Sequence, residues 1–181
     1  MRRRRANGEF MGGPRGKTLS VSAAMILTAF CASGARAEGW RTYHNARFGT
    51  TADVPESWAM GEPPENDDGR IFTAPDKRSE LIVSGSFHVL PHEEEIAIKL
   101  APNEGETVAY VKRGKDWIVV SGTKGDEIFY RKSILSCNGT IWNSVSIRYP
   151  SVEKGKFDPL VVRVAGSLRS GRGYGFVAEC R

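Results

Sequence analysis

The chain has 181 residues, of which 40% are hydrophobic and 9% aromatic, and its formal net charge is +5. This length and composition are typical of one packed domain with a short additional segment, and they exclude a large barrel, a two-domain nucleotide enzyme and a disordered chain. A net positive charge suits nucleic acid or an acidic membrane as a partner, so its position along the chain decides what it means.

Residues 1–37 have the three parts of an export signal. Basic residues at Arg2–Arg5 precede an apolar run over 19–30, and small residues lead to an Ala-Arg-Ala site that ends at Ala37. The apolar run is shorter than the ~20 residues that span a bilayer, so we expect cleavage after Ala37 and not a membrane anchor. Met11 is an alternative start, because residues 11–37 alone form a complete signal.

The positive charge lies in this presequence. Seven of the 26 basic residues and one of the 21 acidic residues fall within residues 1–37, so that segment carries +6 and the remainder carries −1. A nearly neutral exported domain is a poor match for nucleic acid. We therefore expect a periplasmic protein with no nucleic-acid partner and no stable membrane insertion after cleavage.

The first half of the mature chain is predicted to be mostly strands. Residues 41–44 and 50–54 flank a turn and are predicted to form a hairpin, and 70–74 is predicted to be a short strand. Trp58 is a candidate core anchor. Residues 81–90 alternate, with Leu81 and Val83 on one face and small polar residues on the other, as expected of a half-buried strand.

A short helix over 93–100 is predicted next, followed by a meander of strands over 106–113, 117–121, 127–136 and 140–149. Asn138-Gly139 is the strongest hairpin signal in the chain. Asp158-Pro159 then predicts a helix N-terminus, with Pro159 in the first helical position. The apolar stripe that follows, which ends at Leu168, is typical of a helix that covers one face of a sheet.

Three segments carry a resemblance to a known family. Tyr43-His-Asn-Ala-Arg-Phe-Gly49 and Asp53-Val-Pro-Glu-Ser-Trp58 resemble the opening hairpin of PsbP-like and Mog-like domains, and Ala165-Gly-Ser-Leu168 resembles the end of their closing helix. The chain also looks like a group of small exported proteins of Gram-negative bacteria, over residues 39–168.

The resemblance implies a fold and an exported localisation, but it implies no enzymatic activity. The implied fold is α+β, an antiparallel β-sheet with helices packed on its faces in an α/β/α sandwich, and it agrees with the strands predicted above. We expect a single domain over residues 38–168 and a flexible C-terminal tail over 169–181.

Cysteine usage agrees with export. Cys31 leaves with the presequence, so the mature chain holds Cys137 and Cys180. In an oxidising compartment an even pair predicts an intramolecular disulfide, with two separate thiols as the alternative.

His88 is the main candidate for metal binding or for general-base catalysis. His88 and His92 are four apart beside three glutamates, but Pro91 between them breaks the helical geometry that zinc chelation would need. His88 could act as a base for Ser84 or Ser86 in a small hydrolase, because residues two apart on a strand point the same way. We expect no metal, no cofactor and no catalytic residues.

One strand face carries a weak binding signal. Trp142 and Arg148 share a face with two serines, and Trp and Arg are frequent at interaction sites. With His88, these are the candidate binding residues. The alternative is that a helix covers Trp142 while Arg148 extends to water.

These features together predict an exported single-domain protein of the periplasm that is not an enzyme. Its expected role is a non-catalytic binding or accessory function in the cell envelope, with a small ligand or an envelope protein as partner. The alternatives are the His88 hydrolase and an envelope assembly subunit that relies on Trp142.

Overall fold

The computed structural model describes residues 38–173, which lie within one compact unit of the chain. The predicted export signal, residues 1–37, lies outside the described residues. Within the described part, no helix is both long enough and apolar enough to span a membrane.

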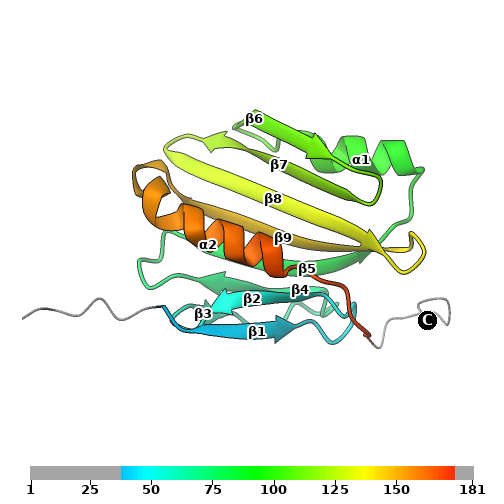
Figure 1. The fold of residues 1–181 in the computed structure, drawn as a ribbon, viewed down its shortest axis with the longest axis horizontal. Coiled ribbons are helices and arrows are strands. Elements are labelled where there is room, and N and C mark those ends of the chain that lie inside the picture. Colours follow the sequence, from blue (N-terminus) through cyan, green and yellow to red (C-terminus); the bar gives the residue numbers. More distant parts are fainter. Residues whose placement is uncertain (1–37, 174–181) are drawn as a thin grey trace, which may run out of the picture. The chain divides into compact units, whose positions relative to one another are not determined.

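A seven-stranded sheet forms the centre of the domain (Figure 1), with the strand order β3-β4-β5-β9-β8-β7-β6 and every neighbouring pair antiparallel. Its strands are β3 (Ala59–Met60), β4 (Gly69–Thr73), β5 (Glu80–Phe87), β6 (Glu106–Arg113), β7 (Trp117–Lys124), β8 (Glu127–Ser136) and β9 (Ile141–Pro150). A separate hairpin pairs β1 (Trp40–His44) with β2 (Thr51–Pro55). The antiparallel α+β fold predicted from the sequence is confirmed.

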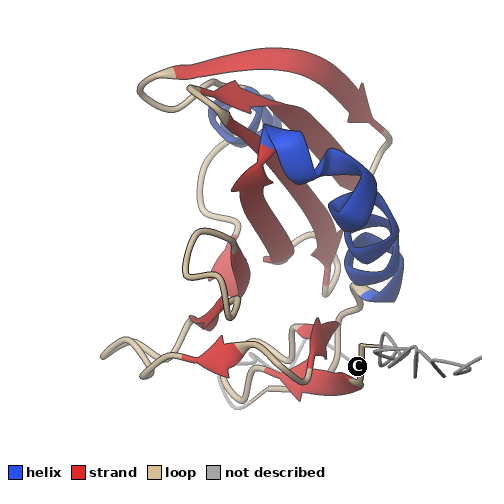
Figure 2. Cartoon of the chain, turned by 90° about the vertical axis from the view of Figure 1, so that its left-hand side faces the viewer, coloured by secondary structure: helices blue, strands red, loops and turns tan. Residues whose placement is uncertain are grey.

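The two helices lie on opposite faces of the sheet. Helix α2 (Lys154–Ser167) crosses one face beside the β1–β2 hairpin, whereas the short helix α1 (His92–Leu100) packs on the other face near β7 (Figures 1 and 2). Strand alternation sets this division. Val145 and Ile147 of β9 point toward α2, and Trp142 points toward α1.

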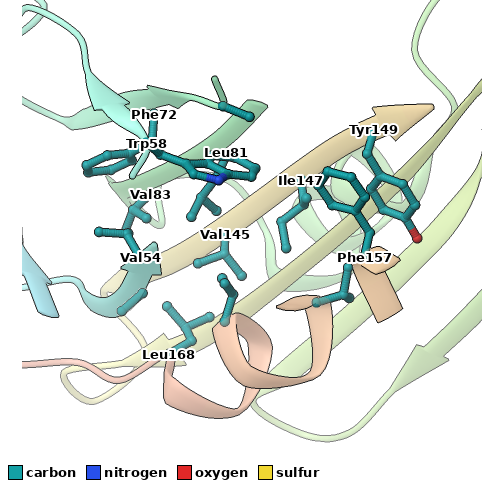
Figure 3. Packing of buried hydrophobic residues seen from close by; sticks show 14 residues of the cluster. Val54, Trp58, Phe72, Leu81, Val83, Val145, Ile147, Tyr149, Phe157 and Leu168 are labelled. Atoms are coloured by element: carbon teal, nitrogen blue, oxygen red, sulfur yellow. The ribbon is translucent and has the colours of Figure 1, made fainter. Parts of the chain in front are cut away.

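The larger core lies between the sheet, α2 and the hairpin (Figure 3). Leu81 and Val83 of β5 pair directly with Ile147 and Val145 of β9 and pack with Val54 of β2. Each of these five side chains is at most 1% exposed, and burial of a side chain of this size contributes about 1.5–3 kcal/mol. The predicted alternation therefore builds the core at Leu81 and Val83, but the strand ends at Phe87, three residues earlier than expected, and Val89 is 76% exposed.

Helix α2 begins earlier than predicted. The expected N-terminus at Asp158 is wrong, because a 3₁₀ turn over Ser151–Glu153 leads directly into a helix that starts at Lys154, so that Pro159 lies inside the helix. The Asp158 carboxylate does not cap the helix; it accepts hydrogen bonds from Lys154 Nζ at 2.8 and 2.7 Å. Gly155, four residues before Pro159, has no side chain to add to the crowding that a helical proline causes.

The hairpin predicted at Asn138-Gly139 is confirmed. Ser136 of β8 pairs with Ile141 of β9, so four residues connect the two strands. Cys137, Asn138 and Gly139 have positive φ angles of 57°, 53° and 85°, and Gly139 N donates to Ser136 O at 3.1 Å. Glycine and asparagine adopt this left-handed conformation more readily than other residues, which is why the dipeptide marks the turn.

The tail predicted from residue 169 begins inside the folded unit. Arg169 exchanges two backbone hydrogen bonds with Thr51 of β2, each 2.9 Å long. The chain after α2 is thus held against the hairpin, at least as far as this bridge.

Candidate functional site

A cavity of about 780 Å³ opens where the β1–β2 hairpin, the turn at residues 74–79 and α2 meet. Its walls are largely apolar, and they come from segments far apart in the sequence. We call it the aromatic pocket, and its principal lining residues are Trp40, Trp58, Pro75, Phe157, Leu160 and Arg163. A cavity of this volume, apolar with a few polar groups, is typical of sites for small ligands.

Two of the aromatic walls are held rigidly by the core. Trp58 is 4% exposed and meets Phe157 edge to face, with 6.3 Å between ring centroids. Phe157 in turn stacks on Tyr149 of β9 at 4.7 Å, as Figure 3 shows. Trp58, predicted as a core anchor, is therefore both a core residue and a wall of the pocket.

Trp40 forms the third aromatic wall, and a cationic side chain packs against its ring. The guanidinium carbon of Arg163, on α2, lies 4.3 Å from the centroid of the Trp40 ring. Arg163 Nε also pairs with Asp53 Oδ2 at 3.2 Å. A guanidinium has five N–H groups, so one that stacks on Trp40 and pairs through Nε can still donate to a ligand from its outer nitrogens.

Charges of both signs line the remainder of the aromatic pocket. Lys156 and Arg163 lie on α2, Glu38 precedes β1, and Asp76 lies in the turn at residues 74–79. Lys156 Nζ pairs with Glu153 at 2.8 Å, and Glu38 Oε2 accepts from Ser57 Oγ at 2.9 Å. The pocket thus combines apolar walls with two cationic and two anionic side chains.

The Asp76 carboxylate is fixed by its own turn. Oδ1 accepts from the backbone N–H groups of Arg78 and Ser79 at 2.8 and 3.0 Å, and Oδ2 accepts from Ser79 Oγ at 3.0 Å. Burial by itself raises the pKa of Asp76, but these hydrogen bonds and the charge of Arg78 outweigh it, so the pKa is lowered. Asp76 is therefore a preorganised anion at the pocket wall.

Trp142, a predicted binding residue, is not on the surface. Its side chain is fully buried in a cluster with Ile96 of α1 and Ile118 of β7. His92 of α1 stacks on its ring at 6.3 Å, and Lys99 Nζ lies 5.2 Å from its centroid. The helix that the sequence left open as an alternative cover for Trp142 is α1.

Arg148 lies near the C-terminal end of β9 and extends to water. Its side chain is 42% exposed and pairs with Glu80 at 2.9 Å and Glu127 at 3.3 Å. Trp142 and Arg148 share a strand face, as predicted, but the structure does not join them in one surface.

Both ring nitrogens of His88 face other groups. Nδ1 lies 2.7 Å from the carbonyl oxygen of Gly139 and so must donate a proton, and Nε2 lies 3.2 Å from Glu95 Oε2. In the described part of the chain, no hydrogen bond joins His88 to Ser84 or Ser86. The His92 ring meets His88 edge to face at 5.4 Å, so His88 lies within the polar packing between α1 and the β8–β9 turn.

The structure describes Cys137, in the β8–β9 turn, whereas Cys180 lies outside the described residues. The predicted disulfide therefore stays a prediction.

Sequence reasoning missed the aromatic pocket. Trp40 and Arg163 are 123 residues apart in the chain, and no local spacing connects them. Only Trp58 carried a signal, as a large aromatic just after a strand. Their association depends on how the β1–β2 hairpin packs beside α2.

The antiparallel sheet with α2 and a hairpin on one face and α1 on the other defines a PsbP-like fold. The chain is similar to the solution structure of cyanobacterial PsbP (CyanoP) from Synechocystis sp. PCC 6803, with a TM-score of 0.54 and 11% sequence identity, over 76% of this chain and 96% of that chain. No protein-family model and no curated protein matches the chain. At this identity the likeness shows the fold alone, which is the fold that the opening hairpin and closing helix indicated.

Proposed function

We propose that the chain is an exported, non-catalytic binding protein of the cell envelope, and that the aromatic pocket is its ligand site. The pocket itself carries the proposal. It presents three aromatic walls and a stacked guanidinium in a cavity of about 780 Å³. These features suit a ligand with an apolar or aromatic body and an anionic group that Arg163 can bind.

A binding role agrees with the surroundings of His88 better than hydrolysis does. A general base needs a ring nitrogen that can accept the proton of the nucleophile. Here Nδ1 donates to Gly139 O, and Nε2 faces Glu95. Trp142 offers no surface for an assembly role, because its side chain is fully buried.

Export is testable on the protein itself. The protein expressed with its own N-terminal segment in a Gram-negative host is expected in the periplasmic fraction. Its first residue, read by N-terminal sequencing, should be Glu38, because the Ala-Arg-Ala site ends at Ala37. If the protein is found only in the cytoplasmic fraction, with its N-terminal segment uncleaved, the proposed export is contradicted.

The pocket is testable with an aromatic anion as probe. Anilinonaphthalene sulfonate is expected to bind with saturable fluorescence. Trp40→Ala or Arg163→Gln should weaken this binding about tenfold, because each removes one recognition group worth more than about 1 kcal/mol. The change is measured by titration at constant ionic strength.

The matched control is Arg113→Gln, which makes the same substitution as Arg163→Gln at an exposed arginine of β6 that does not line the aromatic pocket. This variant should keep the affinity of the wild type for the probe. Equal weakening by the Arg163 and Arg113 substitutions, or no effect of either pocket substitution, would contradict the proposed ligand site.

A further inference from the structure

A second surface lies on the α2 face of the sheet, beyond the reach of α2. We call it the aromatic platform, and it consists of Tyr110, Lys112, Trp117, Tyr130 and Lys132, from β6, β7 and β8. Helix α2 crosses the sheet beside β8 and β9 and leaves the β6 and β7 end of this face uncovered (Figure 1). A cavity of about 440 Å³ lies over Trp117, Tyr130 and the two lysines.

Strand register arranges the platform residues in rows. Tyr110 and Tyr130 both pair with Ser121 of β7, and Lys112 and Lys132 both pair with Val119. Directly paired residues point to the same face, so each row crosses three neighbouring strands. Strands lie about 4.8 Å apart, which separates the two tyrosines by about 10 Å.

The aromatic rings and one ammonium group are accessible. Tyr110 is 50% exposed, and Trp117 and Tyr130 are half-buried. Burial raises the pKa of Tyr130, and the neighbouring Tyr110 adds to this effect. Lys112 Nζ lies 5.9 Å from the centroid of the Trp117 ring.

The charge of the platform is positive. Lys112 is exposed, Lys132 Nζ donates to Ala165 O at 2.6 Å, and one carboxylate, that of Asp116, lies at the Trp117 end. Two cations against one anion favour a ligand that carries negative charge, and the rings favour one with flat faces.

We propose that the aromatic platform binds an acidic polysaccharide, whose sugar rings stack on Tyr110, Tyr130 and Trp117 while its carboxylates meet the lysines. Nucleic acid is disfavoured, because residues 38–181 carry a net charge of −1 and the platform offers two lysines where a phosphate backbone calls for many. A peptide that adds a strand to β6 is disfavoured by the register shift between Val108 and Tyr110, because such irregularities protect sheet edges.

The test is a calorimetric titration of the purified protein with four probes. Oligogalacturonate has sugar rings and carboxylates, malto-oligosaccharide of the same length has rings without charge, polyphosphate has charge without rings, and oligo-dT represents nucleic acid. Oligogalacturonate is expected to bind tightest of the four. Tyr110→Ala should weaken it about tenfold, and Lys112→Gln should weaken it and reduce its dependence on salt.

Trp40→Ala is the control, because it alters the aromatic pocket and leaves the platform intact. The affinity of this variant for oligogalacturonate should equal that of the wild type. This separates failure of the platform from failure of the pocket. The proposal is overturned if oligogalacturonate gives no saturable heat, if any of the other three probes binds as tightly, or if Tyr110→Ala has no effect.

Discussion

Replacing Trp142 with alanine is expected to lower the free energy of unfolding by about 3–5 kcal/mol, the usual cost of removing a buried tryptophan. The side chain is fully buried, and the cluster that it forms with Ile96 and Ile118 holds α1 on the sheet. The cavity left behind would therefore loosen α1 as well as reduce global stability.

Urea unfolding followed by far-UV circular dichroism measures the global loss, because this signal does not depend on the substituted indole. Hydrogen exchange of the amides in α1 measures the local loss, and these amides should exchange faster in the variant. A loss of less than about 1 kcal/mol would contradict the buried position of Trp142.

Trp142→Phe is the informative companion. The indole Nε1 is buried and has no hydrogen-bond partner among the described residues. An unpaired buried N–H carries an uncompensated desolvation cost, so replacement by an apolar ring removes that cost while keeping much of the packing. We expect a loss of about 1 kcal/mol or less. A loss as large as that of the alanine variant would show that the indole N–H itself matters.

The strand pattern of the sequence predicted most of the sheet, because alternation is a local property. Leu81 and Val83 had to share a face, and the register with β9 places them against Ile147 and Val145. The same alternation put Trp142 on the opposite face. Which helix covers that face depends on the long-range packing of α1, and the sequence could only state the two alternatives.

The aromatic pocket could not be predicted for a related reason. Trp40 lies in β1, Trp58 follows β2, and Arg163 lies on α2, so their proximity is a property of tertiary packing. The start of α2 was misplaced because a local rule, Asp-Pro at a helix N-terminus, does not hold here: a 3₁₀ turn over Ser151–Glu153 leads directly into a helix that starts at Lys154. In both cases a local signal was not enough to predict the structure.

If the protein is exported as proposed, loss of the predicted disulfide should have the second large effect on stability. Residues 137 and 180 are 43 positions apart, and that interval contains all of β9 and α2. By the chain-entropy model, closing a loop of this length contributes about 3–4 kcal/mol, so the double substitution Cys137→Ser and Cys180→Ser should cost about that much in an unfolding titration.

Substitution by serine separates the effect of the disulfide bond from that of the backbone conformation. Cys137 has a positive φ of 57°, and serine, like cysteine, carries a Cβ there, so the backbone strain stays the same. Each single substitution should therefore cost as much as the double one, and reduction of the wild type should reproduce the loss. Thiol counting in denatured, unreduced protein from the periplasm decides the matter directly. No free thiol is expected, and two free thiols per chain would end the hypothesis that Cys137 and Cys180 are joined.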